Sequence, residues 1–177
     1  MQTNLVRNLY RWLVANPWHE SLTIKYDLNS YGNCGESHRS PLYIGEKKRG
    51  EGREVQVSQP DIVALREDTQ TVDLIVEVEA LPKKPKDFYG LLASAIFADN
   101  HTPSYEYGSN SRYTYRETLI VLVTLRSGED AERVAETMRR KVPLAALGIR
   151  GVCVCGGEEA EARFQELIRS QFSYGTG

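Results

Sequence analysis

QPDIVALREDTQTVDLIVEVEA, the stretch from Gln59 to Ala80, contains two apolar segments joined by a polar connection. Ile62–Leu65 and Val72–Val78 are rich in β-branched and other apolar residues, whereas Arg66–Thr71 is polar. β-Branched runs of this length favour strands, and a short polar connection between two such runs favours a hairpin. The stretch therefore predicts two antiparallel strands at the centre of a sheet.

Three carboxylates lie close together on this predicted hairpin. With a hairpin centred near Thr69, Asp61 falls opposite Glu77. Side chains at positions i and i+2 of a strand share a face, so Glu77 and Glu79 point to the same side. The second strand then has one acidic and one apolar face. The residues expected on the apolar face are Leu74, Val76, Val78 and Ala80.

Neighbouring carboxylates favour a divalent cation. Like charges at close range repel, and each loses hydration energy on burial, so a bound cation removes an unfavourable interaction. Mg²⁺ takes oxygen ligands, often one or two carboxylates completed by water and substrate phosphate. Asp61, Glu77 and Glu79 are the predicted ligands. The alternative is a half-exposed strand whose solvent face carries two glutamates.

Pro60-Asp61 followed by Glu77-Val78-Glu79 resembles the signature of the PD-(D/E)XK nuclease superfamily. That signature is Pro-Asp in one strand and an acidic-x-Lys triplet in the next. Glu79 stands where the family usually has lysine, although some restriction enzymes of the superfamily also have glutamate there. The resemblance covers roughly residues 4 to 126. It implies a restriction-endonuclease-like core with the element order αβββαβ and a mixed central sheet flanked by helices.

The chemistry implied by the resemblance is divalent-metal-dependent hydrolysis of phosphodiester bonds in DNA. Asp61 and Glu77 would bind Mg²⁺ or Mn²⁺, which polarises the phosphoryl oxygen and lowers the pKa of a bound water. Glu79 would orient or deprotonate that water, or hold a second metal. Each chain would have one active site, and cleavage of a duplex requires one cut in each strand. The same chemistry therefore favours a two-fold homodimer.

Two further roles in such a site have candidates elsewhere in the sequence. A lysine from outside the motif could replace the missing one, with Lys86 as the first candidate, followed by Lys83 and Lys84. Glu20 is a candidate fourth metal ligand, because this fold often draws an acidic residue from its first helix toward the active site. Glu20, however, follows the predicted helix.

Basic residues flank the acidic hairpin, although the net charge of the chain is only −2. Cations that hold the backbone beside carboxylates that hold a metal are what a phosphodiester substrate needs. The alternative is a solvated loop of ordinary charge. The candidate nucleic-acid-binding residues are Arg39, Lys47, Lys48, Arg49, Arg53, Lys83 and Lys84.

The 177-residue chain fits a single domain, residues 1–177, with a nuclease-like core over about 4–126 and a C-terminal extension over about 127–173. No stretch approaches the roughly 18 apolar residues that span a bilayer, and the N-terminus lacks a signal-peptide pattern. We therefore expect a cytoplasmic protein without membrane contact. A zinc site from Cys34, Cys153, Cys155 and a histidine remains an alternative, although no C-x-x-C spacing is present.

Hydrophobic periodicity predicts an α/β fold whose first elements follow the order helix, three strands, helix and strand. A buried strand after the second helix completes a right-handed βαβ unit. The expected helices cover residues 5–14, 88–96, 131–138 and 158–172, with Ser127 and Asp130 as a capping box for the third. The expected strands outside the hairpin cover 22–28, 119–125 and 152–155. Residues 29–52 and 100–115 are expected to be loops.

Two other interpretations fit the same residues. In the first, Glu79 marks a lost active site, and the protein is a catalytically inactive nuclease-fold protein that binds DNA or a protein partner. In the second, the chain is an unrelated α/β interaction domain whose acidic strand face is exposed to solvent. Metal binding and DNA cleavage discriminate among the three.

Overall fold

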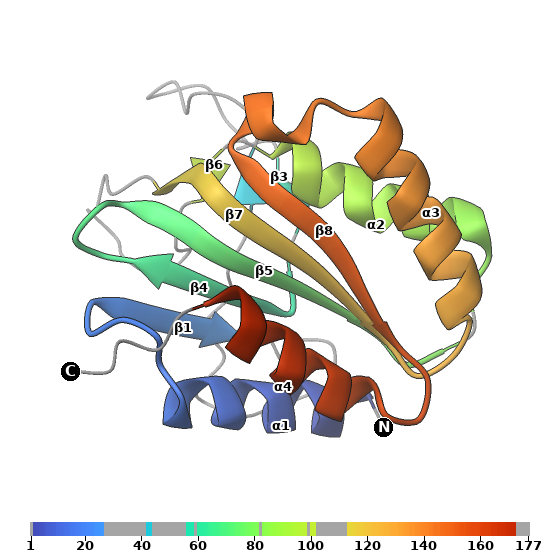
Figure 1. The fold of residues 1–177 in the computed structure, drawn as a ribbon, viewed down its shortest axis with the longest axis horizontal. Coiled ribbons are helices and arrows are strands. Elements are labelled where there is room, and N and C mark those ends of the chain that lie inside the picture. The colour runs from blue at the N-terminus through green and yellow to red at the C-terminus, as the bar shows by residue number, and fades with distance from the viewer. Residues whose placement is uncertain are drawn as a thin grey trace.

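The computed structural model describes residues 2–26, 42–43, 56–58, 60–81, 83–98, 100–101 and 113–172. In this part of the chain the helices cover a single sheet (Figure 1). The elements in chain order are α1 (Gln2–Ala15), β1 (Leu22–Tyr26), β2 (Leu42–Tyr43), β3 (Gln56–Ser58), β4 (Ile62–Arg66), β5 (Thr71–Glu79), α2 (Pro85–Phe97), β6 (Asn100–His101), β7 (Tyr113–Thr124), α3 (Gly128–Lys141), the 3-10 helix η2 (Leu144–Leu147), β8 (Ile149–Gly156) and α4 (Ala160–Gln171).

The sheet is mixed, and its longer strands lie in the order β1-β4-β5-β7-β8. β4 pairs antiparallel with both β1 and β5, whereas β7 runs parallel to both β5 and β8. The short strands β6, β2 and β3 continue the sheet from the first residues of β7. The predicted parallel pairing of the second hairpin strand with residues 119–125 is confirmed, since Leu74 pairs with Leu119 and Val78 with Val123.

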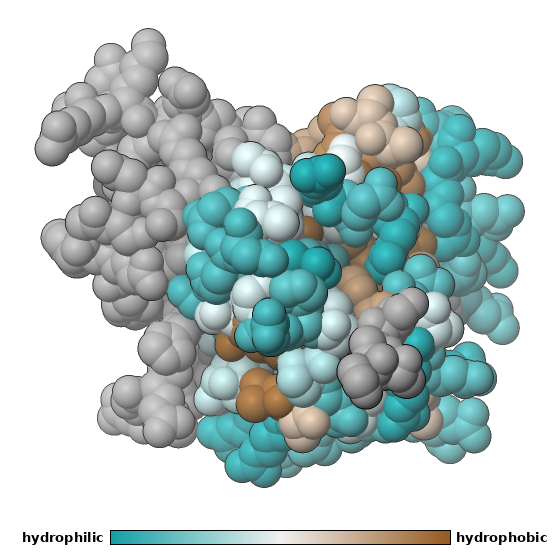
Figure 2. All heavy atoms as spheres, turned by 60° about the vertical axis from the view of Figure 1, so that its left-hand side comes forward, coloured by the Kyte–Doolittle hydropathy of each residue, from teal (hydrophilic) through white to brown (hydrophobic). Residues whose placement is uncertain are grey.

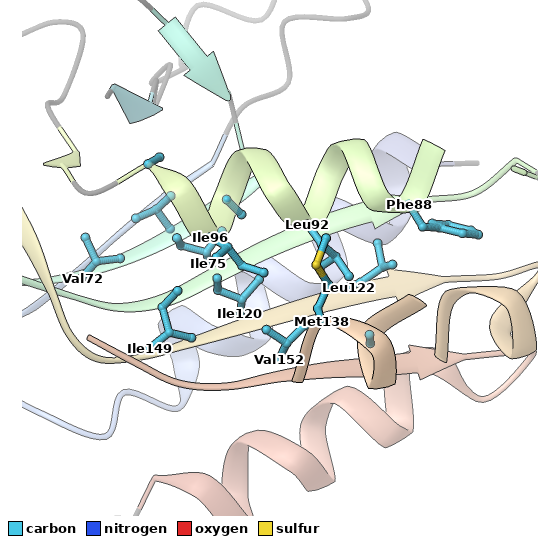
Figure 3. Packing of buried hydrophobic residues seen from close by; sticks show 14 of the residues in the cluster. Val72, Ile75, Phe88, Leu92, Ile96, Ile120, Leu122, Met138, Ile149 and Val152 are labelled. Carbon is cyan, nitrogen blue, oxygen red and sulfur yellow. The ribbon is translucent and has the colours of Figure 1, made fainter. Parts of the chain in front are cut away.

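Helices cover both faces of the sheet, with α1 and α4 on one side and α2 and α3 on the other (Figure 1). Alternation along the strands sends Leu74 and Val76 toward α1 and α4, whereas Ile75 and Ile120 pack under α2 and α3 (Figure 3). β5 is buried along its whole length. The sequence prediction of an α/β fold with a mixed sheet between helices is confirmed.

The register of the β4–β5 hairpin changes at Asp73. Ala64 pairs with Leu74 and Leu65 with Val72, so Asp73 is an extra residue on β5. Such a bulge reverses the alternation of faces. Val72 accordingly belongs to the core under α2 and α3, although Leu74 belongs to the core under α1 and α4.

Several sequence predictions differ from the structure. The expected loop over residues 100–115 contains β6 and the first residues of β7, because Thr114 pairs with Thr71 and Tyr115 with Val72. The capping box at Ser127 is wrong, since Ser127 has a φ of 56° and its side chain makes no capping hydrogen bond. Within the expected C-terminal extension, β8 joins the main sheet by pairing with β7.

None of the helices within the described ranges has the length and apolar character needed to cross a bilayer. Of the loop predicted over residues 29–52, only the two residues of β2 are described, and β2 pairs with β3 and β6. The rest of that prediction lies outside the described residues.

Two glycines give substitutions with opposite expected effects on stability. A Cβ at Gly156 would lie 2.9 Å from Cα of Gly128, where the end of β8 meets the start of α3. We expect Gly156→Ala to lower the free energy of unfolding by roughly 1–3 kcal/mol, because backbone must move apart. Gly90, in α2, has no heavy atom within 4 Å of such a Cβ, so Gly90→Ala should raise it by roughly 0.5–1 kcal/mol. Urea unfolding of both variants checks this, and equal effects would contradict the close contact.

Candidate functional site

Asp61 and Glu77 lie level with each other at the end of the β4–β5 hairpin. Ile62 pairs with Val76, so extending the ladder by one residue brings Asp61 opposite Glu77. Val63 follows Asp61 by two residues, Ile75 precedes Glu77 by two, and both pack under α2 and α3. By alternation, Asp61 and Glu77 belong to the same face. The register agrees with the predicted placement of Asp61 opposite Glu77, and their role as metal ligands stays a prediction.

Asp61 is held against the backbone of β5. The N–H of Val78 donates a hydrogen bond to Oδ2 of Asp61, with an N–O distance of 2.7 Å. The carboxylate thus satisfies a strand N–H beyond the point where β4 begins. Asp61 is half-buried and Glu77 is only 5% exposed. Two carboxylates in such a place carry a desolvation cost that a cation can offset.

Glu79 lies on the same face of β5 but is engaged with the residues that follow the strand. Its Oε1 accepts a hydrogen bond of 3.0 Å from the N–H of Leu81. Its Oε2 lies 3.2 Å from Nζ of Lys83, in an ion pair between a mostly buried carboxylate and a more exposed ammonium group. Glu79 therefore positions a lysine at the end of the strand.

The three lysines after β5 have different environments. Lys83 contacts Glu79, as just described. Lys84 precedes α2, where its N–H donates to Oδ2 of Asp87 at 3.1 Å, and the N–H of Asp87 donates to the carbonyl of Lys84 at 2.9 Å. Lys86 lies exposed in the first turn of α2. Lys83, instead of the first sequence candidate Lys86, thus places a positive charge beside Glu79.

Glu20 lies at the wrong end of the sheet to join these residues. Leu22 pairs with Arg66, and the N–H of Glu67 donates to the carbonyl of Ser21 at 3.0 Å, so Glu20 lies beside the β4–β5 turn. Asp61 precedes the other end of β4, about 13 Å away along a strand of five residues. Glu20 is therefore outside the carboxylate set.

Asp61 and Glu77 fit a hard divalent cation as a pair, because Mg²⁺ commonly uses only one or two carboxylates. Glu79 is directed to Lys83, and within the described ranges no group of three or more acidic, histidine or cysteine side chains is arranged to hold a metal. For the zinc alternative, Cys153 and Cys155 lie two residues apart on β8, where burial raises the pKa of the Cys155 thiol to about 12 and also raises that of Cys153. Cys34 lies outside the described residues.

Sequence reasoning missed Asp73, a carboxylate only 6% exposed at the bulge of β5. The signal for it was available, because Arg66 and Asp73 lie on either side of the polar connection. By contrast, most of the predicted nucleic-acid-binding residues lie outside the part of the chain that is described. These residues are Arg39, Lys47, Lys48, Arg49 and Arg53.

The site thus consists of two level carboxylates at one end of the β4–β5 hairpin and a Glu79–Lys83 ion pair directly after β5. Comparisons with protein-family models, with curated proteins and with solved structures found no match.

Proposed function

We propose that the protein is a divalent-metal-dependent endonuclease acting on DNA, with Asp61 and Glu77 as the metal ligands. The observation that carries the proposal is the level placement of these two carboxylates on one face of neighbouring strands. With the short strands β2, β3 and β6 left out, the order of α1, β1, β4, β5, α2 and β7 supports it, because it follows the αβββαβ order expected of restriction-endonuclease-like cores. Mg²⁺ or Mn²⁺, when bound, would polarise the phosphoryl oxygen and activate a water.

The protein groups around this pair have separate roles in the proposed reaction. The N–H of Val78 orients the Asp61 carboxylate, which limits the reorganisation needed to bind a cation. Glu79 holds the ammonium group of Lys83 beside the end of the strand. We infer that the ammonium group of Lys83 stabilises the negative charge that develops on the attacked phosphate, as the usual motif lysine does. Glu79 is its positioning residue.

The remaining parts of the proposal follow from what duplex DNA requires. Exposed Lys84 and the basic segment from Arg39 to Arg53 would hold the phosphate backbone without reading its sequence. Cleavage of both strands would use a two-fold dimer, which presents one active site to each strand.

The first test is cleavage of supercoiled, linear duplex and single-stranded DNA with Mg²⁺, Mn²⁺ or EDTA. We expect cleavage with either metal and none with EDTA. Asp61→Asn and Glu77→Gln should each lower the rate by about 100-fold or more, because each removes a negative ligand at the reacting centre. Glu166→Gln, on the exposed side of α4, is the matched control and should cleave at the wild-type rate.

Circular dichroism and urea unfolding of the same variants separate lost chemistry from lost fold. Asp61→Asn and Glu77→Gln should remain folded, since both substitutions relieve repulsion between neighbouring carboxylates. Cleavage that persists at the wild-type rate in both folded variants would refute the assignment of Asp61 and Glu77.

The second test concerns the substituted motif position. Lys83→Met should lower the cleavage rate by about 100-fold, because it removes the positive charge proposed to stabilise the attacked phosphate. Glu79→Lys in the Lys83→Met background should restore part of that loss, since it returns lysine to the usual position of the motif. Lys86→Met is the control and should have little effect. A loss with Lys86→Met and none with Lys83→Met would reverse the assignment.

A catalytically inactive nuclease-fold protein is the second candidate. Two observations favour it: both oxygens of Glu79 are engaged by Leu81 and Lys83, and Asp61 caps a backbone N–H. DNA binding without cleavage under any metal condition would select this candidate. Its binding should then be insensitive to Asp61→Asn.

A further inference from the structure

A hollow of about 330 Å³ lies at the opposite end of β5 from Asp61 and Glu77. It opens where the β4–β5 turn, the first residues of β7 and the start of β8 come together. Figure 2 brings this end of the sheet toward the viewer, and the described part of that face is mainly hydrophilic, with apolar atoms visible in the recesses. The lining residues are Arg66, Thr69, Thr71, Asp73, Arg116, Glu117, Arg150 and Phe172.

Four of these residues occupy irregular positions of three adjacent strands. Asp73 is the extra residue of β5. Val72 pairs with Tyr115 but Leu74 pairs with Leu119, so Arg116 and Glu117 lie in a bulge of β7. On β8, Thr118 pairs with Ile149 and Leu119 with Gly151, which makes Arg150 the extra residue there.

Aligned irregularities of this kind turn side chains out of the regular alternation, and they concentrate near binding sites. Glu117 also has a φ of 59°, a left-handed conformation that is costly for a residue with a side chain. Three strands therefore depart from regular geometry at one level, and the departures converge on one hollow.

Two of the three arginines are held in place. Arg66 donates from Nη2 and Nε to Oδ2 of Asp73, at 2.5 and 3.0 Å. The Arg150 guanidinium lies 4.6 Å from the ring centroid of Phe172 and donates from Nη1 to the carbonyl of Gln171 at 3.1 Å. Phe172 stacks in turn on Trp18, with centroids 4.1 Å apart. A guanidinium fixed in this way loses little entropy when it binds an oxyanion.

The lining has more positive than negative side chains available to a ligand. Asp73 is satisfied by Arg66 and by the indole N–H of Trp18, which donates to Oδ2 at 3.0 Å. Arg116 is exposed and forms no hydrogen bond or ion pair with the described residues. Arg116 and Arg150 therefore outweigh Glu117. The hydroxyl groups of Thr69 and Thr71 lie 2.8 Å apart, and Thr71 donates to Oδ1 of Asp73 at 3.5 Å, so both hydroxyl groups are engaged within the lining.

We propose that this hollow binds the phosphate group of a small phosphorylated molecule, with Arg116 and Arg150 as its main contacts. Guanidinium groups match phosphate oxygens in paired, charge-assisted hydrogen bonds. The volume is at the lower end of that found for small-ligand sites, which suits one phosphate and a short substituent. Trp18 and Arg150 lie over the ring of Phe172, so the site selects the phosphate instead of stacking a base on that ring.

This proposal is independent of the nuclease proposal, because β5 separates the two sites along its length. Calorimetric titration of the full chain with inorganic phosphate and with glycerol 3-phosphate tests it, with acetate as the planar-anion comparison. We expect both phosphates to bind and acetate to bind more weakly. Arg116→Gln and Arg150→Gln should each raise the phosphate dissociation constant by about tenfold or more, because each removes charge-assisted hydrogen bonds.

Arg11→Gln, on the exposed side of α1, is the matched control and should leave phosphate binding unchanged. Arg116→Gln should also keep the wild-type unfolding midpoint, which separates a binding loss from a folding loss. Absence of phosphate binding, equal affinity for acetate, or the same loss with Arg11→Gln would overturn the proposal. A short DNA duplex provides the last arm: if Arg116→Gln weakens duplex binding but not glycerol 3-phosphate binding, the small-molecule assignment is wrong.

Discussion

The ion pair between Arg66 and Asp73 sets the register on which both ends of the β4–β5 hairpin depend. Three N–H groups, from Arg66 Nε, Arg66 Nη2 and the indole of Trp18, converge on one oxygen of Asp73. The residue they hold is the extra one of the bulge. Without it, the pairing of Leu65 with Val72 would continue, and Asp61 would lie level with Val76 instead of Glu77. A slip of one residue moves every side chain to the other face, so the carboxylates would no longer share one.

The buried carboxylate of Asp73 is tolerated in an otherwise apolar strand because the ion pair with Arg66 compensates for its charge. Asp73 is almost fully buried, and removing its partner would leave an uncompensated charge, at a cost on the order of 3–5 kcal/mol. The pair also separates two chemically different ends of β5. Carboxylates gather at the carboxyl end of the strand, and arginines gather at its amino end. One local irregularity therefore supports both proposed sites.

The sequence predicts the fold well where burial determines the pattern and less well where long-range pairing does. The apolar runs around Ile62, Leu74 and Leu119 identify the central strands, because residues buried on both faces must be apolar. The polar start of β7 predicts a loop from its sequence, because its strand geometry comes from pairing with β5. The bulge was equally invisible, because one polar residue in a β-branched run looks like ordinary alternation.

The candidate site shows the same division. A hairpin centred near Thr69 predicts Asp61 opposite Glu77, and in the structure this placement also depends on the bulge at Asp73, which the sequence pattern does not reveal. Which lysine reaches Glu79 depends on how the chain turns after β5, and strand periodicity does not encode that turn. The sequence therefore predicts Lys86 as the first candidate, whereas Lys83 makes the contact. Glu20 is a candidate metal ligand only by analogy with an acidic residue of the first helix in this fold. The antiparallel pairing of β1 with β4 places it near the β4–β5 turn instead.

The two ends of the chain cover the same face of the sheet, and this has a consequence for synthesis on the ribosome. Leu9 and Leu13 of α1 share one core with Phe164 and Ile168 of α4, and Trp18 stacks on Phe172. α1 therefore lacks part of its packing surface until α4 has been translated. Because a domain generally folds as a unit, the apolar stripe of α1 stays partly uncovered while the residues between α1 and α4 are made. A nascent chain of this protein thus has a long interval in which chaperones can bind that stripe.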